Sequence, residues 1–147
     1  MRGEKLETFV VLSLRLLAVS FAVVGILFIA FPDGVLDTIS DLGHSLGDFT
    51  RAPGTVEKFW LALAFAYMVV IAGICAVAQA DPVRYRPFLL VLAAGKTASS
   101  LAALGFYLFD QHVFIYLLNF AVDGLLALTA VWLWSLTGRI SSPAAPG

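Results

Sequence analysis

Four long runs of apolar residues divide the chain, and each run is long enough to cross a bilayer as a helix. They cover residues 9–31, 59–80, 88–109 and 113–136. A helix that crosses the hydrocarbon core of a bilayer needs about 20 predominantly apolar residues. The pattern therefore predicts an all-α membrane protein with four transmembrane helices. The first run exceeds the apolar core of a secretory signal, about 7–15 residues, so we expect an uncleaved helix there.

The long connection between the first two runs has a different pattern. Its apolar residues recur at the three- and four-residue spacing of a helix, and acidic residues fall mostly between them. The apolar positions are Val35, Leu36, Ile39, Leu42, Leu46 and Phe49. This spacing predicts an amphipathic helix over about residues 34–49 that lies flat on the external membrane surface.

The remaining connections predict how the helices are arranged. Only residues 110–112 separate the last two runs, so these runs must form an antiparallel hairpin. We expect a four-helix up-down bundle, built as a single membrane domain over residues 1–147 with a disordered tail at 138–147. The segments at one end carry most of the basic residues: Arg2, Lys5, Arg84, Arg86 and Arg139. The positive-inside rule then places both termini in the cytoplasm and the amphipathic helix outside.

Composition supports a membrane location. Hydrophobic residues make up 61% of the chain and charged residues 13%, against about 45–50% and about 25% in soluble domains. The lipid bilayer is therefore the first expected partner. The net charge of −1 and the lack of a basic run disfavour nucleic acid as a partner. Cys75 is the single cysteine, which excludes an intramolecular disulfide and a CxxC motif.

Three ionisable residues interrupt the apolar runs: Arg15 in the first, Lys96 in the third and Asp123 in the fourth. A charge at the centre of a transmembrane helix costs about 2.5–3.5 kcal/mol when it faces lipid. We therefore expect one buried cluster in which Asp123 accepts hydrogen bonds from Arg15 and Lys96. Further hydrogen-bonding partners for this cluster are Asn119, Ser99, Ser100 and Tyr67.

Two cations and one anion leave the charges of this cluster unbalanced, and three explanations remain open. Either Lys96 is neutral, or Arg15 extends to the cytoplasmic interface, or the bundle holds an anionic ligand or a partner's acidic residue. The role of the cluster is open as well. The cluster either fixes the register of the helices, or it has a function of its own, which would be binding a small ligand or handling protons or ions.

The sequence contains no recognisable catalytic or cofactor-binding arrangement. The only histidines, His44 and His112, lie outside the apolar runs, so the chain cannot hold haem between two histidines of its own in the membrane. Acidic residues near these histidines lack the spacing of metal ligands. There is no Ser-His-Asp order and no glycine-rich nucleotide loop. We therefore expect no metal, no cofactor and no catalytic residue, and we favour a non-enzymatic protein.

Several of these features resemble the DoxX-like group of small bacterial membrane proteins. They are the four-span layout, Arg15 early in the first span, the small residues that end at Gly25, and the long external connection. Members of the group commonly continue from this glycine to a lysine, whereas here Ile26-Leu27-Phe28 follows. Some members are accessory subunits of quinone-linked oxidoreductases. The resemblance implies an accessory protein of a bacterial inner membrane, in a larger complex or a homo-oligomer, and it transfers no catalytic residue.

Overall fold

The computed structural model describes residues 2–53 and 58–140, and within these ranges it contains five α-helices and no β-strand. The helices are α1 (Arg2–Ala30), α2 (Pro32–Leu46), α3 (Lys58–Ala80), α4 (Arg86–Phe109) and α5 (Phe114–Ile140). The four long helices, α1, α3, α4 and α5, are long and apolar enough to cross a membrane. The prediction of an all-α chain with four such helices is confirmed.

The long helices begin at different residues from the apolar runs, and α1 and α5 also end at different residues. Helix α1 begins at Arg2 rather than at residue 9, because polar residues such as Glu4 and Lys5 are good helix formers that an apolar pattern does not detect. Helix α5 continues through Ile140, so residues 138–140 of the expected tail are helical. Residues 141–147 lie outside the described part of the chain.

Helix α2 follows α1 after a single residue. Phe31 separates the two helices, and Pro32 takes the first position of α2, where its missing N–H is not needed. The helix ends at Leu46, three residues before the predicted end. Phe49 therefore lies in the connection that follows, where its ring packs edge-on against Phe114 with centroids 5.1 Å apart.

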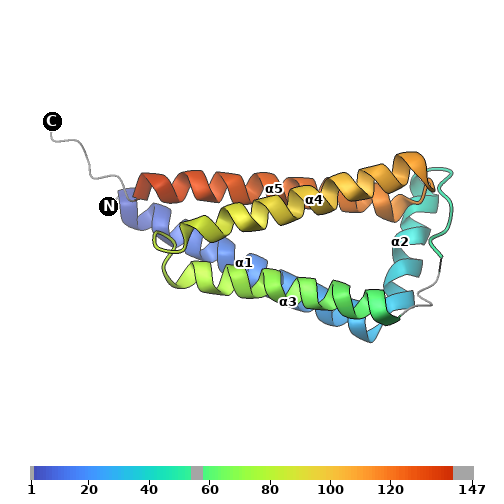
Figure 1. Ribbon diagram of the computed structural model, residues 1–147, viewed down its shortest axis with the longest axis horizontal. Helices are drawn as coiled ribbons and strands as arrows, with labels where there is room; N and C mark the ends of the chain where they lie inside the picture. Colours follow the sequence, from blue (N-terminus) through green and yellow to red (C-terminus); the bar gives the residue numbers. More distant parts are fainter. Residues whose placement is uncertain (1, 54–57, 141–147) are drawn as a thin grey trace.

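The four long helices form two closely packed pairs (Figure 1). Helix α1 packs along α3, and α4 packs along α5, whereas contacts between the two pairs are fewer. The pairs converge at the end where α1 begins and α5 finishes, and they diverge toward α2. We call these the narrow end and the wide end. The core of the narrow end contains Val10, Leu14, Ala78, Leu89, Leu133 and Leu136.

Along the inward face of α3, residues are buried at the narrow end and exposed at the wide end, where the helix pairs diverge. Ala78, Cys75 and Ile71 share one face of α3 at three- and four-residue spacing, and they are at most 2% exposed. The same face continues to Ala64, which is exposed, and to Trp60, which is 63% exposed. The face of α3 that is buried at the narrow end is therefore open at the wide end.

Helix α2 crosses the wide end and contacts α1 and α5 (Figure 1). Its buried residues are Ser40 and Gly43. A Cβ atom at Gly43 would lie 2.5 Å from the Cβ of Phe114 in α5, closer than real side chains approach. Glycine at this position thus lets the backbone of α2 rest directly on the first turn of α5.

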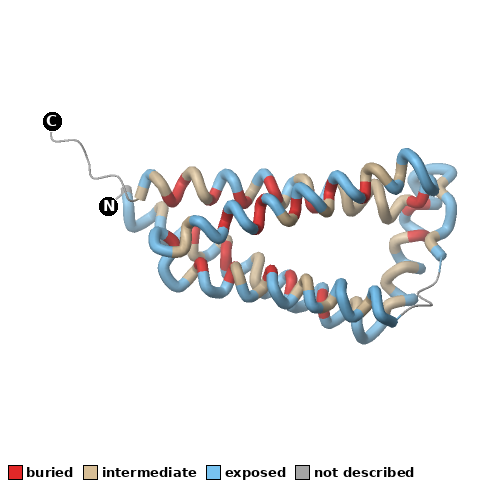
Figure 2. The backbone as a smooth tube through the Cα atoms, viewed as in Figure 1, coloured by how far each residue is buried: buried red, intermediate tan, exposed pale blue. Residues whose placement is uncertain are grey.

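The outer surfaces of the long helices are exposed along most of their length (Figure 2). Many of the exposed side chains are large and apolar, among them Leu16, Val70, Leu101 and Leu128. Such a surface is unusual for a monomer in water and suits contact with lipid.

Candidate functional site

A buried ion pair lies between α4 and α5. The Lys96 ammonium donates a hydrogen bond to Asp123 Oδ1 over 2.8 Å. Lys96 is 1% exposed and Asp123 is 4% exposed. Among the described residues, this is the one ion pair in which both side chains are buried. Burying two charges is costly, and direct contact with a hydrogen bond offsets much of that cost.

Two aromatic rings complete the surroundings of the ammonium group. Lys96 Nζ lies 4.5 Å from the ring centroid of Phe21 in α1 and 5.1 Å from that of Tyr67 in α3. Both distances are within the range in which a cation is attracted to an aromatic face. The ammonium group of α4 therefore contacts a side chain from each of the other three long helices.

Helical spacing on α4 places Lys96 at this position. Leu89, Leu92 and Ala103 are buried on the same face as Lys96, so the helix must turn its lysine toward the core. The residue before it is Gly95, where an added Cβ would lie 3.3 Å from the Tyr67 hydroxyl. The absence of a side chain at Gly95 gives Tyr67 room to cover the ammonium group.

Serine hydroxyls and small residues hold α4 close to α5 around the pair. Ser100 Oγ donates to the backbone oxygen of Phe120 over 2.8 Å. A Cβ at Gly124 would lie 3.3 Å from Ser100 Oγ, so glycine is the residue that fits there best. Nearer to the wide end, Asn119 Nδ2 donates to Ser99 Oγ over 3.4 Å. The structure thus gathers Lys96, Asp123, Ser99, Ser100, Asn119 and Tyr67 in one region.

The predicted three-charge cluster is wrong with respect to Arg15. This residue is exposed, and its Nε donates to Gln79 Oε1 over 3.2 Å. Leu14 and Phe21 occupy the core-facing side of α1, and the residue after Leu14 is rotated away from that side. Gln79 lies in the last turn of α3, so Arg15 is near the narrow end, and the buried charges balance as one cation and one anion.

Replacing Arg15 should therefore have little effect on stability. We expect Arg15→Gln to change the free energy of unfolding in detergent by no more than about 0.5 kcal/mol, as is usual for an exposed substitution. Thermal unfolding followed by circular dichroism measures this change. A loss as large as that of a buried charge would contradict the exposed position of Arg15.

Sequence reasoning missed two aromatic partners of the cations, Phe21 for Lys96 and Trp134 for Arg86. It placed Tyr67 near Lys96, but as a hydrogen-bonding partner and not as an aromatic ring beneath the cation. Phe21 follows Leu14 by seven residues, which places it on the same face of α1, but the apolar run offered several phenylalanines. A second cation was also missed. Arg86 Nε donates to the Trp134 backbone oxygen over 2.9 Å, and its guanidinium lies 4.1 Å from the Trp134 ring centroid. In the sequence Arg86 indicates only the orientation of the chain, whereas in the structure it also joins α4 to α5 at the narrow end.

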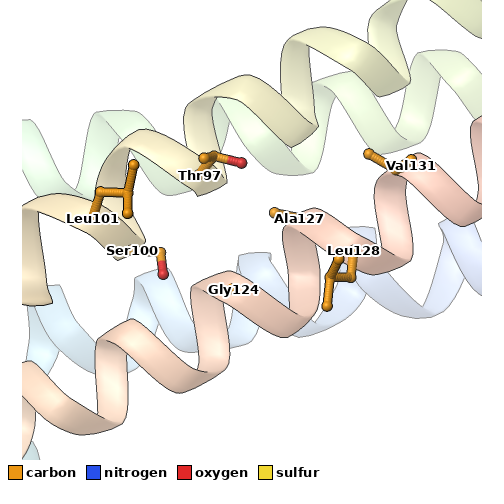
Figure 3. A pocket seen from close by; sticks show the side chains of 7 residues that line it. All are labelled: Thr97, Ser100, Leu101, Gly124, Ala127, Leu128 and Val131. Atoms are coloured by element: carbon orange, nitrogen blue, oxygen red, sulfur yellow. The ribbon is translucent and has the colours of Figure 1, made fainter.

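Two apolar grooves lie beside the buried pair. One, of about 310 Å³, runs along the seam between α4 and α5, where Thr97, Gly124 and Leu128 are among its lining residues (Figure 3). The other, of about 120 Å³, lies between α3 and α4 and reaches Tyr67 and Gly95. The described part of the chain contains no group of three His, Cys, Asp or Glu side chains placed to hold a metal ion.

No protein-family model, no curated protein and no solved structure matches this chain.

Proposed function

We propose that this chain is a small, non-enzymatic integral membrane protein of the accessory or assembly type. In this proposal, the ion pair of Lys96 and Asp123 fixes α4 against α5, and the contacts of the Lys96 ammonium with Phe21 and Tyr67 join these helices to α1 and α3 in one four-helix up-down bundle. The observation that supports it best is that the Lys96 ammonium contacts side chains from α1, α3 and α5. A group that is held from three sides is suited to positioning helices.

The energetics favour a role in specificity. A buried ion pair adds little net stability over apolar residues of similar volume, but helix arrangements that separate its members leave a charge unpaired. In hydrocarbon such a charge costs at least about 2.5–3.5 kcal/mol. The pair therefore disfavours alternative registers of α4 against α5, and the contacts of Lys96 with Phe21 and Tyr67 favour one placement of the α1–α3 pair against it.

The proposed setting is a bacterial inner membrane, with both termini in the cytoplasm and α2 on the external face. The distribution of basic residues at the narrow end supports this orientation, since Arg84 and Arg86 lie there. The resemblance to DoxX-like proteins favours an accessory subunit in a larger membrane complex or a homo-oligomer. The extensive apolar outer surface suits either lipid or a partner helix.

A purification experiment tests this role. The protein is extracted from its native membrane in a mild detergent, and the proteins that co-migrate on a native gel are identified. We expect a defined complex, and we expect the double variant K96M/D123L to form the same complex because its buried volume is retained. A wild-type chain that migrates alone would contradict an accessory role.

The alternative function is binding of a small ligand, or handling of protons or ions, at the same residues. Asn119, Ser99 and Tyr67 are only half-buried, which favours this alternative over a wholly structural cluster. Under this alternative, K96M/D123L would remain folded and lose binding or transport. Reconstituted vesicles that contain a pH-sensitive dye measure proton movement directly, and a flux that depends on Lys96 and Asp123 would favour the alternative.

A further inference from the structure

The wide end holds polar residues on α4 and α5 and exposed apolar residues on α3. Ser99 lies one turn beyond Lys96 along α4, and Asn119 lies one turn before Asp123 along α5. Both positions are displaced toward the wide end, since α4 finishes there and α5 begins there (Figure 1). On the other helix pair, Ala64 and Trp60 continue the inward face of α3 and are exposed.

The polar side of this region has unused hydrogen-bonding capacity. Within the described residues, the side chain of Asn119 makes one hydrogen bond, the long contact of 3.4 Å to Ser99. An asparagine amide offers two donors and an acceptor oxygen with two lone pairs. Ser99 and Asn119 are half-buried, and no buried side-chain nitrogen or oxygen atom of the described residues lacks a hydrogen-bond partner. The unused groups of Asn119 therefore keep exposed surface, through which another molecule can reach them. The arrangement favours a polar partner at this position.

We propose that the wide end binds an uncharged amphiphile. Its hydroxyl or carbonyl head group hydrogen-bonds to Asn119 and Ser99, and its hydrocarbon chain lies against the exposed inward face of α3 at Ala64 and Trp60. The head group carries no charge, because Lys96 and Asp123 neutralise each other directly below it. The ligand enters from the bilayer between α3 and α4, which make few contacts with each other.

This site uses the fold described above and does not depend on an accessory role. The native-gel experiment can therefore fail while this inference holds, and the reverse is also possible. The ion pair itself is not a ligand contact in this proposal, so variants at Ser99 and Asn119 leave Lys96 and Asp123 in place.

Fluorescence of Trp60 provides the test. The full chain carrying W132F and W134F, which leaves Trp60 as its one tryptophan, is titrated in maltoside micelles with a monoacylglycerol whose chain carries bromine. Bromine quenches tryptophan fluorescence at short range. We expect saturable quenching of Trp60, and we expect the apparent Kd to rise about tenfold in N119L, the effect of losing a hydrogen bond to a buried polar group. S99A should also raise the apparent Kd, and it changes the volume of the side chain less than N119L does.

Matched controls separate this site from general partitioning into the micelle. Thr97→Val removes a hydroxyl from the groove along the seam between α4 and α5 and should leave the apparent Kd unchanged. The brominated fatty acid, whose carboxylate is charged at neutral pH, should bind about tenfold more weakly than the monoacylglycerol, since its charge has no buried counterion to meet. Quenching that rises linearly with the probe and is equal in wild type, S99A and N119L would overturn the proposal, and so would equal binding of the fatty acid.

Discussion

Lys96→Met is expected to destabilise the folded bundle by about 3–5 kcal/mol, the usual cost of removing one member of a buried ion pair. The substitution leaves Asp123 buried without its hydrogen-bond donor. It also removes the cation that lies against Phe21 and Tyr67. Reversible unfolding in mixed micelles, followed by circular dichroism, measures the loss.

The double variant K96M/D123L tests whether the stability lost in K96M is due to the unpaired charge of Asp123. Two apolar side chains of similar volume fill the same space and leave no charge unpaired, so most of the lost stability should return. The methionine thioether also packs favourably against aromatic rings such as those of Phe21 and Tyr67. Lys58→Met, an exposed substitution at the start of α3, is the matched control and should have little effect. If K96M alone were as stable as wild type, the contacts of Lys96 with Asp123, Phe21 and Tyr67 would not hold the bundle together.

Gly43→Ala is expected to lower stability and to displace α2 from the wide end. The new Cβ would lie 2.5 Å from the Cβ of Phe114, and neither atom belongs to a flexible chain end. Overpacking of this kind typically costs about 1–3 kcal/mol. Hydrogen exchange of the backbone amides of α2 measures the displacement, and we expect exchange to accelerate there while the amides around Lys96 remain protected.

Gly34→Ala is the control for this effect, because it makes the same change in the same helix. Its added Cβ would have Phe31 as its nearest neighbour at 4.0 Å, an ordinary contact. Alanine is a better helix former than glycine by about 1 kcal/mol, so this variant should be as stable as wild type or more stable. Equal effects of the two substitutions would show that the contact of Gly43 with Phe114 does not position α2.

The long helices could be predicted from the sequence because each is marked by a long apolar run. Their ends could not be predicted equally well, since residues such as Glu4 and Lys5 extend α1 without adding to the apolar pattern. The amphipathic spacing predicted the helix that became α2, but not the position of Phe49 after its end. Helical periodicity describes the interior of an element, whereas its ends depend on local capping and packing.

The candidate site could likewise be predicted from the sequence only in part. Lys96 and Asp123 were expected to meet because each is costly in an apolar run, and this argument needs only the sequence. The same cost argument placed Arg15 with them incorrectly, because it does not consider which face of α1 the arginine occupies or how near it lies to the narrow end. The divergence of the two helix pairs depends on how four helices pack together, and no pattern within a single run contains that information.

The position of Cys75 gives the protein an internal reporter. Its thiol is the only one in the chain and has no exposed surface, and it lies in a core shared by α1, α3, α4 and α5. A maleimide added to the folded protein can reach this sulfur only when the helices around it separate. The rate of alkylation in native membranes would therefore measure how often the bundle opens, with no engineered label.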